Sequence, residues 1–256
     1  MIVEYPSSKA QCIRLARAFR DAPRVDLSID CVIEGQMGKA LVDDAEHPQA
    51  FQIQVGPFFY FAGDAASPGG REMLAHIAPY TLFMPSAPGW IEAAKALYEE
   101  RLAVLDRYGF SSERLSVEHL ERLCAGSPFE QRVKRMDAAF AASVWGREHF
   151  VDLSDYDSAD DFVQCGVGFY LADGEAAIGA AYASLVCGRG IEVSIFVQEE
   201  HRRQGVATVL ASHLLLWGLE NRMDPHWDAA NPESCRLAVK LGYTPTGTYE
   251  AYYLRE

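Results

Sequence analysis

The chain has 256 residues, a formal net charge of −13 and a 49% share of hydrophobic residues, enough to bury one large core or two modest ones. This negative charge disfavours nucleic acid and anionic membranes as partners, so any anionic ligand must be held by a local basic patch. The six cysteines form no C-x-x-C pair, no metal-like spacing joins them to the histidines, and no segment approaches 18 consecutive apolar residues. We therefore expect a soluble cytoplasmic protein without a metal ion.

The first half of the chain predicts short strands that alternate with helices. The expected elements are strands at residues 31–35, 38–44, 50–56 and 58–64, a short helix at 67–78, a buried strand at 79–85 and an amphipathic helix at 89–102. A connecting helix follows, with Ser116 as its N-cap and Gly126 after its end. These signals place a boundary near residues 112–128 and divide the chain into domains of residues 1–120 and 121–256.

The second half predicts the order β-β-β-α-β-α-β. Asp173-Gly174 is a strong hairpin signal within residues 168–186, and a second hairpin is expected around residues 187–190. The remaining elements are a long helix at about 203–221, a strand at 225–230, a helix at 231–242 and paired strand segments at 243–254. Asn231 and Pro232 are suited to the start of that second helix. The fold class is therefore α/β (α+β), with a mixed, mostly antiparallel sheet flanked by helices.

The turn between the third strand and the long helix carries the sequence Arg202-Arg203-Gln204-Gly205, where a helix-capping residue would be expected. Without a capping side chain, the first backbone N–H groups of the helix stay available at its positive end, an arrangement that binds phosphate. Gly205 allows a ligand to approach the backbone closely. An ordinary helix start with solvated arginines is the alternative interpretation.

Residues Arg202 to Ala207 match R/Q-x-x-G-x-G/A, and the chain here resembles the GNAT superfamily of acetyl-CoA-dependent N-acyltransferases. The later segment "NPESCRLAVKLGY" resembles a second superfamily motif, so the resemblance covers about residues 128–256. A narrower resemblance, carried by residues 192–195, "PHWDAANPES" and "AVKLGY", points to the bacterial subgroup that includes zwittermicin A resistance acetyltransferases, and "VIEGQMGKALVDD" and "FFYFAGD" extend it over the first half. It implies a GNAT domain at 121–256 and a GNAT-like domain at 1–120, for which we expect no cofactor.

The resemblance implies acetyl-CoA as the acyl donor and a set of residues that would hold it. Backbone N–H groups of residues 203–208 would bind the pyrophosphate, and the open edge of the preceding strand would pair with the pantetheine arm. The implied cofactor-binding residues are Phe196, Val197, Arg202, Arg203, Gln204, Gly205, Val206, Ala207, Thr208, Asn231 and Ser234. Asn231 is also a plain N-cap candidate, and the two roles are compatible.

Acyl transfer to an amine needs a proton acceptor, and the resemblance implies Glu192 in that role. Alternation places Glu192 on one face of its strand with Ser194 and Phe196. His226 and Asp228 share a face of the next strand and are expected to contact the amine substrate. The alternatives are a salt-bridged Glu192 and polar groups that merely flank a core tryptophan. His213, in the middle of a helix, is expected to be structural.

The sequence departs from the superfamily at Ala238, where many members carry a tyrosine that protonates the leaving thiolate. The nearby candidates are Tyr243, Tyr252, Tyr253 and Cys235, and the helix dipole is expected to favour a thiolate at Cys235. The sequence predicts direct transfer, in a ternary complex, of an acetyl group to a small amine. A non-catalytic acyl-CoA sensor and an enzyme for longer acyl chains are the alternatives. The sequence does not identify the acceptor amine, and it leaves open whether the protein forms a homodimer.

Overall fold

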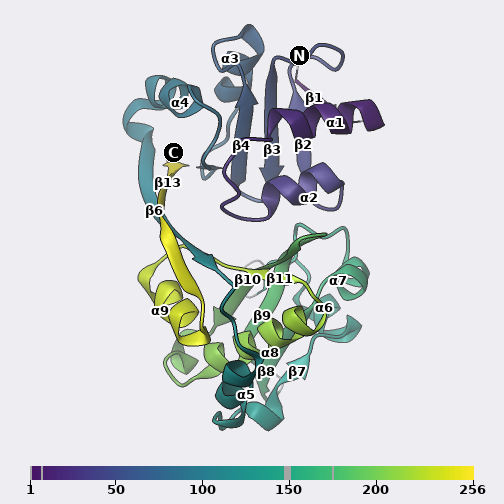
Figure 1. Cartoon of the computed structure of the whole chain (residues 1–256), viewed down its shortest axis with the longest axis vertical. Coiled ribbons are helices and arrows are strands. Elements are labelled where there is room, and N and C mark those ends of the chain that lie inside the picture. Colours follow the sequence, from purple (N-terminus) through teal and green to yellow (C-terminus); the bar gives the residue numbers. More distant parts are fainter. Residues whose placement is uncertain (1, 7, 147–150, 175) are drawn as a thin grey trace. The chain divides into compact units, whose positions relative to one another are not determined.

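The computed structural model describes residues 2–6, 8–146, 151–174 and 176–256, which form two compact units (Figure 1). Unit 1 comprises residues 1–107 with 248–256, and unit 2 comprises residues 108–247. The expected division at residue 120 stays a prediction; among these units, residues 108–120 belong to unit 2 and residues 248–256 return to the sheet of unit 1. Within the described residues, no helix is both long enough and apolar enough to cross a membrane.

Unit 1 is a sheet with strand order β1-β2-β3-β4-β5-β13, accompanied by four helices in its described part. Its elements are β1 (Val3–Tyr5), α1 (Lys9–Ala18), α2 (Ser28–Glu34), β2 (Lys39–Val42), β3 (Ala50–Val55), β4 (Phe58–Gly63), α3 (Pro68–Ala75), β5 (Leu82–Phe83), α4 (Trp90–Tyr98) and η1 (Glu99–Arg101). Strands β4 and β5 run parallel, and the pairs β1–β2, β2–β3, β3–β4 and β5–β13 are antiparallel. Strands β6 (Leu102–Ser111) and β13 (Thr244–Leu254) each pass from one unit into the other.

The strand predicted at residues 31–35 is wrong, because residues 31–34 lie in helix α2. Ile29 and Val32 are both buried and lie three positions apart, which is a helical spacing. The strand was predicted from residues 31–35 alone, and this segment does not include Ile29. Gly35 then ends the helix in a left-handed conformation, with φ of 70°. Strand β6 was not predicted, and the helix expected at 89–102 ends at Tyr98.

Unit 2 contains a five-stranded sheet with the order β11-β10-β9-β8-β7. Its elements are α5 (Val117–Ala125), η2 (Glu130–Arg132), β7 (Lys134–Arg135), α6 (Ala138–Val144), α7 (Ala159–Cys165), β8 (Gly168–Asp173), β9 (Ala176–Cys187), β10 (Gly190–Val197), η3 (Glu199–His201), α8 (Val206–Glu220), β11 (Asp224–His226), β12 (Asp228–Ala229) and α9 (Pro232–Leu241). Antiparallel pairing dominates, which confirms the predicted mixed α/β class. The short elements β7, α6 and α7 were not predicted.

Both hairpins of unit 2 form as predicted. Asp173 pairs with Ala176 across the first turn, and Cys187 pairs with Gly190 across the second. Helix α9 begins after Asn231, whose side chain accepts a hydrogen bond from Ser234 N at 2.8 Å. The sequence therefore located the local signals of this unit correctly.

Helix α8 lies in the centre of unit 2 and packs on the sheet (Figure 1). One side of it, including Val209 and Leu214, packs on β8, β9 and β10, and another side, including Leu215, packs against α9 and the region of Trp227. Because α8 is buried on more than one side, its packing fixes the position of its N-terminus relative to the sheet.

Candidate active site

Strand β10 presents two chemically different faces. Val193, Ile195 and Val197 lie on the face that packs in the core with α8, while Glu192 and Ser194 alternate with them on the other face. The predicted alternation is therefore confirmed. It holds although the β9–β10 ladder has a bulge, because the extra residue lies on β9 between the partners of Glu192 and Val193.

Strand β10 separates from its parallel neighbour in the middle of its length. Gly190 to Glu192 pair with Asp224 to His226, and beyond that point no other strand in the described part of the chain takes the place of β11. The strand predicted at 225–230 is in fact split at Trp227, since β12 pairs with β6 instead. Residues 193–197 therefore have no neighbouring strand on that side among the described residues.

The split corrects one prediction about the amine site. His226 ends β11 in the five-stranded sheet, whereas Asp228 begins β12 opposite Gly109 of β6, so the two do not share a face of one strand. The physical cause is Trp227, which is buried and donates its Nε1 hydrogen to Ser234 Oγ at 3.1 Å. That contact holds the chain against α9 at the position where the strand would have continued.

Glu192 and His226 are in contact at the point where the strands separate, and they form an ion pair when the imidazole is protonated. Glu192 Oε2 lies 2.9 Å from His226 Nδ1, and the two side chains are only 12% and 13% exposed. Their contact follows from the β10–β11 register, in which the two residues are partners. A buried carboxylate beside an imidazole can accept a proton and pass it on. Glu192 thus contacts His226, which is itself a predicted site residue, and the pair matches the alternative of a salt-bridged Glu192 when the imidazole is protonated.

The turn before α8 has the backbone expected of an anion site. Arg203 and Gly205 are both left-handed, with φ of 60° and 93°, and no side chain caps the helix. A Cβ on Gly205 would meet no atom within 4 Å, so the space above it is open. Helix α8 begins at Val206 rather than at 203, because the three preceding residues form this turn.

The polar side chains of the turn have defined partners. Arg202 Nε donates to the carbonyl of Val197 at 3.2 Å, and Gln204 Nε2 donates to the carbonyl of Glu200 at 2.8 Å. Both bonds brace the turn. Thr208, in the first turn of α8, accepts from Lys240 Nζ at 3.1 Å. Lys240 therefore adds a positive charge from α9 that sequence reasoning missed, since only the tertiary fold brings the two helices together.

The side chains considered as proton donors differ in their surroundings. Tyr243 is buried and donates to Pro225 O at 2.6 Å, and its burial raises the hydroxyl pKa well above the usual value. Burial also raises the pKa of the Cys235 thiol, and it outweighs the lowering that the backbone N–H at the start of the helix provides. Tyr252 belongs to unit 1, where Lys95 Nζ lies 4.5 Å from its ring centre. Ala238 is fully buried in the core around Trp227.

A hydroxyl that sequence reasoning missed lies on the Glu192 face. Tyr182 of β9 is the register partner of Ser194, and its oxygen accepts a hydrogen bond from Asp152 N at 3.1 Å. Burial raises the pKa of Tyr182 to about 12, so this group stays protonated at neutral pH.

Comparisons with known proteins agree with this geometry. A family model described as GNAT acetyltransferase matches residues 19–252. An uncharacterized N-acetyltransferase of Bacillus subtilis strain 168, YdfB, is 26% identical over 232 residues, which cover 84% of this chain and 85% of the relative. The crystal structure of a GCN5-related N-acetyltransferase-like protein from Streptococcus suis 89/1591 aligns with a TM-score of 0.82 and 26% identity, over 95% of this chain and 98% of that one. A GNAT-family acetyltransferase of Colwellia psychrerythraea aligns over the full length of both chains with a TM-score of 0.51 and 9% identity, which shows the fold alone.

Proposed function

The chain belongs to the GNAT acetyltransferase family and is an acetyltransferase, and we propose that it transfers the acetyl group of acetyl-CoA directly to a small amine. The observation that carries the proposal is the buried Glu192–His226 pair at the point where β10 and β11 separate. The same strand leads from this pair to the uncapped N-terminus of α8. A binding element for an anion and a proton acceptor thus lie at the two ends of one open strand edge.

The residues around α8 fit an acyl-CoA. The left-handed turn at Arg203 and Gly205 directs backbone N–H groups outward at the positive end of a helix, and Lys240 adds a cation beside Thr208. From Glu192 to Val197 the strand advances about 17 Å, at about 3.3 Å per residue, which suits an extended arm. In this proposal, residues 203–208 hold the pyrophosphate, Phe196 and Val197 flank the arm, and Asn231 and Ser234 lie at the start of α9.

In the proposed mechanism, the Glu192–His226 pair accepts the proton of the incoming amine. An ammonium group has no lone pair, so the amine must lose a proton before it attacks the acetyl carbonyl. Because the carboxylate stabilises an imidazolium beside it, the pair can hold that proton within the site. General base catalysis of this kind is worth roughly 10²–10⁴ in rate. The leaving thiolate then needs a proton. In this proposal Tyr182, a hydroxyl on the same face of the sheet, supplies it and regains a proton from the Glu192–His226 pair, so that the proton lost by the amine ends on the thiol.

A non-catalytic acyl-CoA sensor is the second candidate, because Ala238 replaces the tyrosine that many superfamily members carry. The Glu192–His226 pair argues against it. A buried carboxylate beside an imidazole is an arrangement that a proton acceptor needs and that binding of acyl-CoA alone does not. The narrower resemblance to zwittermicin A resistance acetyltransferases is also part of the proposal, and it leaves the acceptor amine and the acyl chain length to experiment.

A single-turnover experiment separates these candidates. The protein is mixed with labelled acetyl-CoA and a panel of small amines, and binding of acetyl-CoA is measured separately by calorimetry. Binding together with amine acetylation supports the proposal. Binding without transfer to any amine supports the sensor, and transfer only from longer acyl-CoA donors identifies the donor as another acyl-CoA. Absence of acyl-CoA binding overturns the assignment of the α8 turn.

A further inference from the structure

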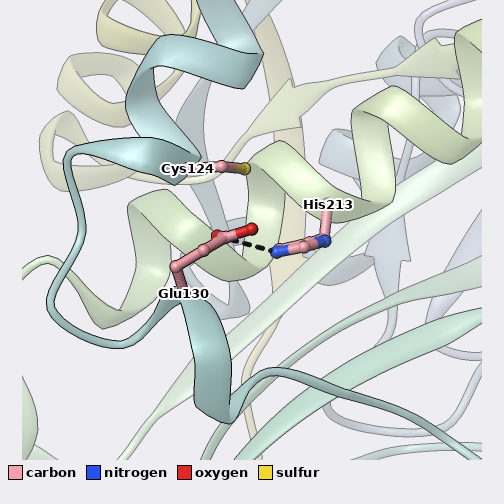
Figure 2. Close-up of side chains that lie close together, drawn as sticks. All are labelled: Cys124, Glu130 and His213. Atoms are coloured by element: carbon pink, nitrogen blue, oxygen red, sulfur yellow. Dashed lines mark hydrogen bonds and ion pairs between the residues drawn. The ribbon is translucent and has the colours of Figure 1, made fainter.

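We propose that Cys124, Glu130 and His213 bind a divalent transition-metal ion, for which zinc is the best match (Figure 2). The three side chains come from α5, η2 and α8, and Figure 2 shows them pointing toward one another from these separate elements. The site is distinct from the Glu192–His226 pair and does not depend on the proposed function.

The distances within this cluster are close to those of a metal site. The Cys124 sulfur, a Glu130 oxygen and a His213 nitrogen lie within 4.8 Å of one another, and His213 Nε2 is 3.1 Å from Glu130 Oε2. Zinc bonds of about 2.0–2.3 Å in tetrahedral geometry place ligand atoms about 3.4–3.6 Å apart. Small side-chain adjustments therefore suffice to bring all three atoms to bonding distance from one ion.

The donor set points to zinc rather than to magnesium or calcium. A thiolate, an imidazole and a carboxylate are the three ligand types that zinc takes in proteins, whereas magnesium and calcium take oxygen ligands almost exclusively. The thiolate and carboxylate together also balance the charge of a divalent cation. With three protein ligands, the fourth position of a tetrahedral ion is left for water.

Exposure varies across the cluster in a way that suits entry of an ion. Cys124 is buried, with 5% exposure, while the side chains of Glu130 and His213 are 27% and 24% exposed. The thiol thus forms the inner wall and the other two ligands face the solvent side. The ring of Phe169 lies 5.5 Å from the His213 ring and limits its movement. In such a site, the ion enters from the solvent side and meets the sulfur last.

A bound ion would join α5 and η2 to the helix that carries the anion turn. His213 lies eight residues after Gly205, which is about 12 Å along α8 at 1.5 Å per residue. The ion would therefore act as a structural clamp on α8, outside the turn itself. Sequence reasoning missed this cluster, since 83 residues separate Glu130 from His213 and no short ligand motif is present.

Cobalt titration of the chelator-treated, reduced full-length protein tests this proposal. We expect one equivalent of Co²⁺ to produce a thiolate-to-cobalt charge-transfer band and the visible bands of a four-coordinate ion, and zinc to displace it. Cys124→Ser should abolish the charge-transfer band. His213→Gln and Glu130→Gln should each weaken metal binding by at least about 100-fold, because losing a ligand costs no less affinity than losing a residue that hydrogen-bonds to a ligand. Cys165→Ser, at an exposed cysteine, is the matched control and should change nothing.

Thermal unfolding supplies a second measurement. Zinc should raise the Tm of the protein and of Cys165→Ser but not that of Cys124→Ser, while acetyl-CoA should shift all three, which shows that the variant is folded. Failure of Co²⁺ to produce the band, or an unchanged band in Cys124→Ser, overturns the proposal and leaves a hydrogen-bonded cluster. A failure of the proposed acetyl transfer would appear separately, in the acetyl-CoA response.

Discussion

Replacement of Glu192 by glutamine should reduce kcat/KM for acetyl transfer by roughly 10²–10⁴, the range typical of a lost general base. At about 1.36 kcal/mol per factor of ten, this is about 3–5 kcal/mol of transition-state stabilisation. Glutamine keeps the size of the side chain and an oxygen that can accept from His226. The change therefore removes the charge and the proton affinity while the packing around them stays.

The geometry of the pair shows why the loss should be large. At a separation of 2.9 Å and an effective dielectric constant near 20, attraction between a carboxylate and an imidazolium is about 6 kcal/mol before desolvation is subtracted. Both side chains are nearly nine-tenths buried, so solvent screens the attraction weakly. Without the carboxylate, an imidazolium at His226 loses this support, and the imidazole becomes a poorer proton acceptor.

A double-mutant cycle measures whether Glu192 and His226 act as one unit. If they do, Glu192→Gln combined with His226→Gln should be little worse than the more severe single change, since effects within one catalytic unit are not additive. Glu199→Gln, at an exposed carboxylate soon after β10, is the matched control and should leave kcat/KM unchanged. A loss of less than tenfold in Glu192→Gln, with acetyl-CoA binding intact, would refute the reasoning.

Three further predictions concern the cofactor turn, the stoichiometry and the buried tyrosine. Gly205→Val should abolish the rise in Tm that acetyl-CoA produces. The control Gly89→Val changes a left-handed helix N-cap of unit 1 with equally open space, so it should destabilise the protein but keep that rise. A full rise in Tm in Gly205→Val would contradict the assignment of the turn. Calorimetry should give one acetyl-CoA site per chain, because unit 1 lacks the R/Q-x-x-G-x-G/A sequence, and a stoichiometry of two would show that unit 1 also binds the cofactor. Because burial raises the pKa of Tyr182 from 10.0 to about 12, the folded state favours the neutral phenol, and its stability contribution is full below pH 10 and is lost as pH rises toward 12. Between pH 10 and pH 12, the free energy of unfolding of the unmodified protein should fall by about 3 kcal/mol more than that of Tyr182→Phe. Denaturant titrations at several pH values measure both losses. Equal losses in the two proteins would exclude Tyr182 as a buried titrating group.

The parts of the fold that the sequence predicts are those set by neighbouring residues. Asp173-Gly174 fixes a hairpin, Asn231 and Pro232 start a helix, and the motif from Arg202 to Ala207 lies at a turn, because each of these signals acts over a few residues. The prediction of a strand at 31–35 was wrong because the helical pattern of this segment begins at Ser28, outside the residues on which the prediction was based.

The parts that the sequence does not predict depend on irregular pairing or on distant contacts. Continued without a bulge, the hairpin that pairs Cys187 with Gly190 would place Tyr182 opposite Ile195, on the core face. The extra residue on β9 moves Tyr182 opposite Ser194, and so onto the face of Glu192. Likewise, the break at Trp227 depends on a hydrogen bond to α9 that no local pattern encodes.

The return of β13 into unit 1 has a consequence for biosynthesis. Tyr252 and Leu254 are buried among Phe61, Phe83 and Trp90, so the core of unit 1 lacks part of its apolar surface until residues 248–256 have left the ribosome. All of unit 2 is translated before them. The first unit to emerge is therefore the last to be completed, and during translation the edge of β5 that will receive β13 is open to wrong strand pairing. A protein shortened by these nine residues should consequently aggregate through unit 1, although every residue of the candidate active site would still be present.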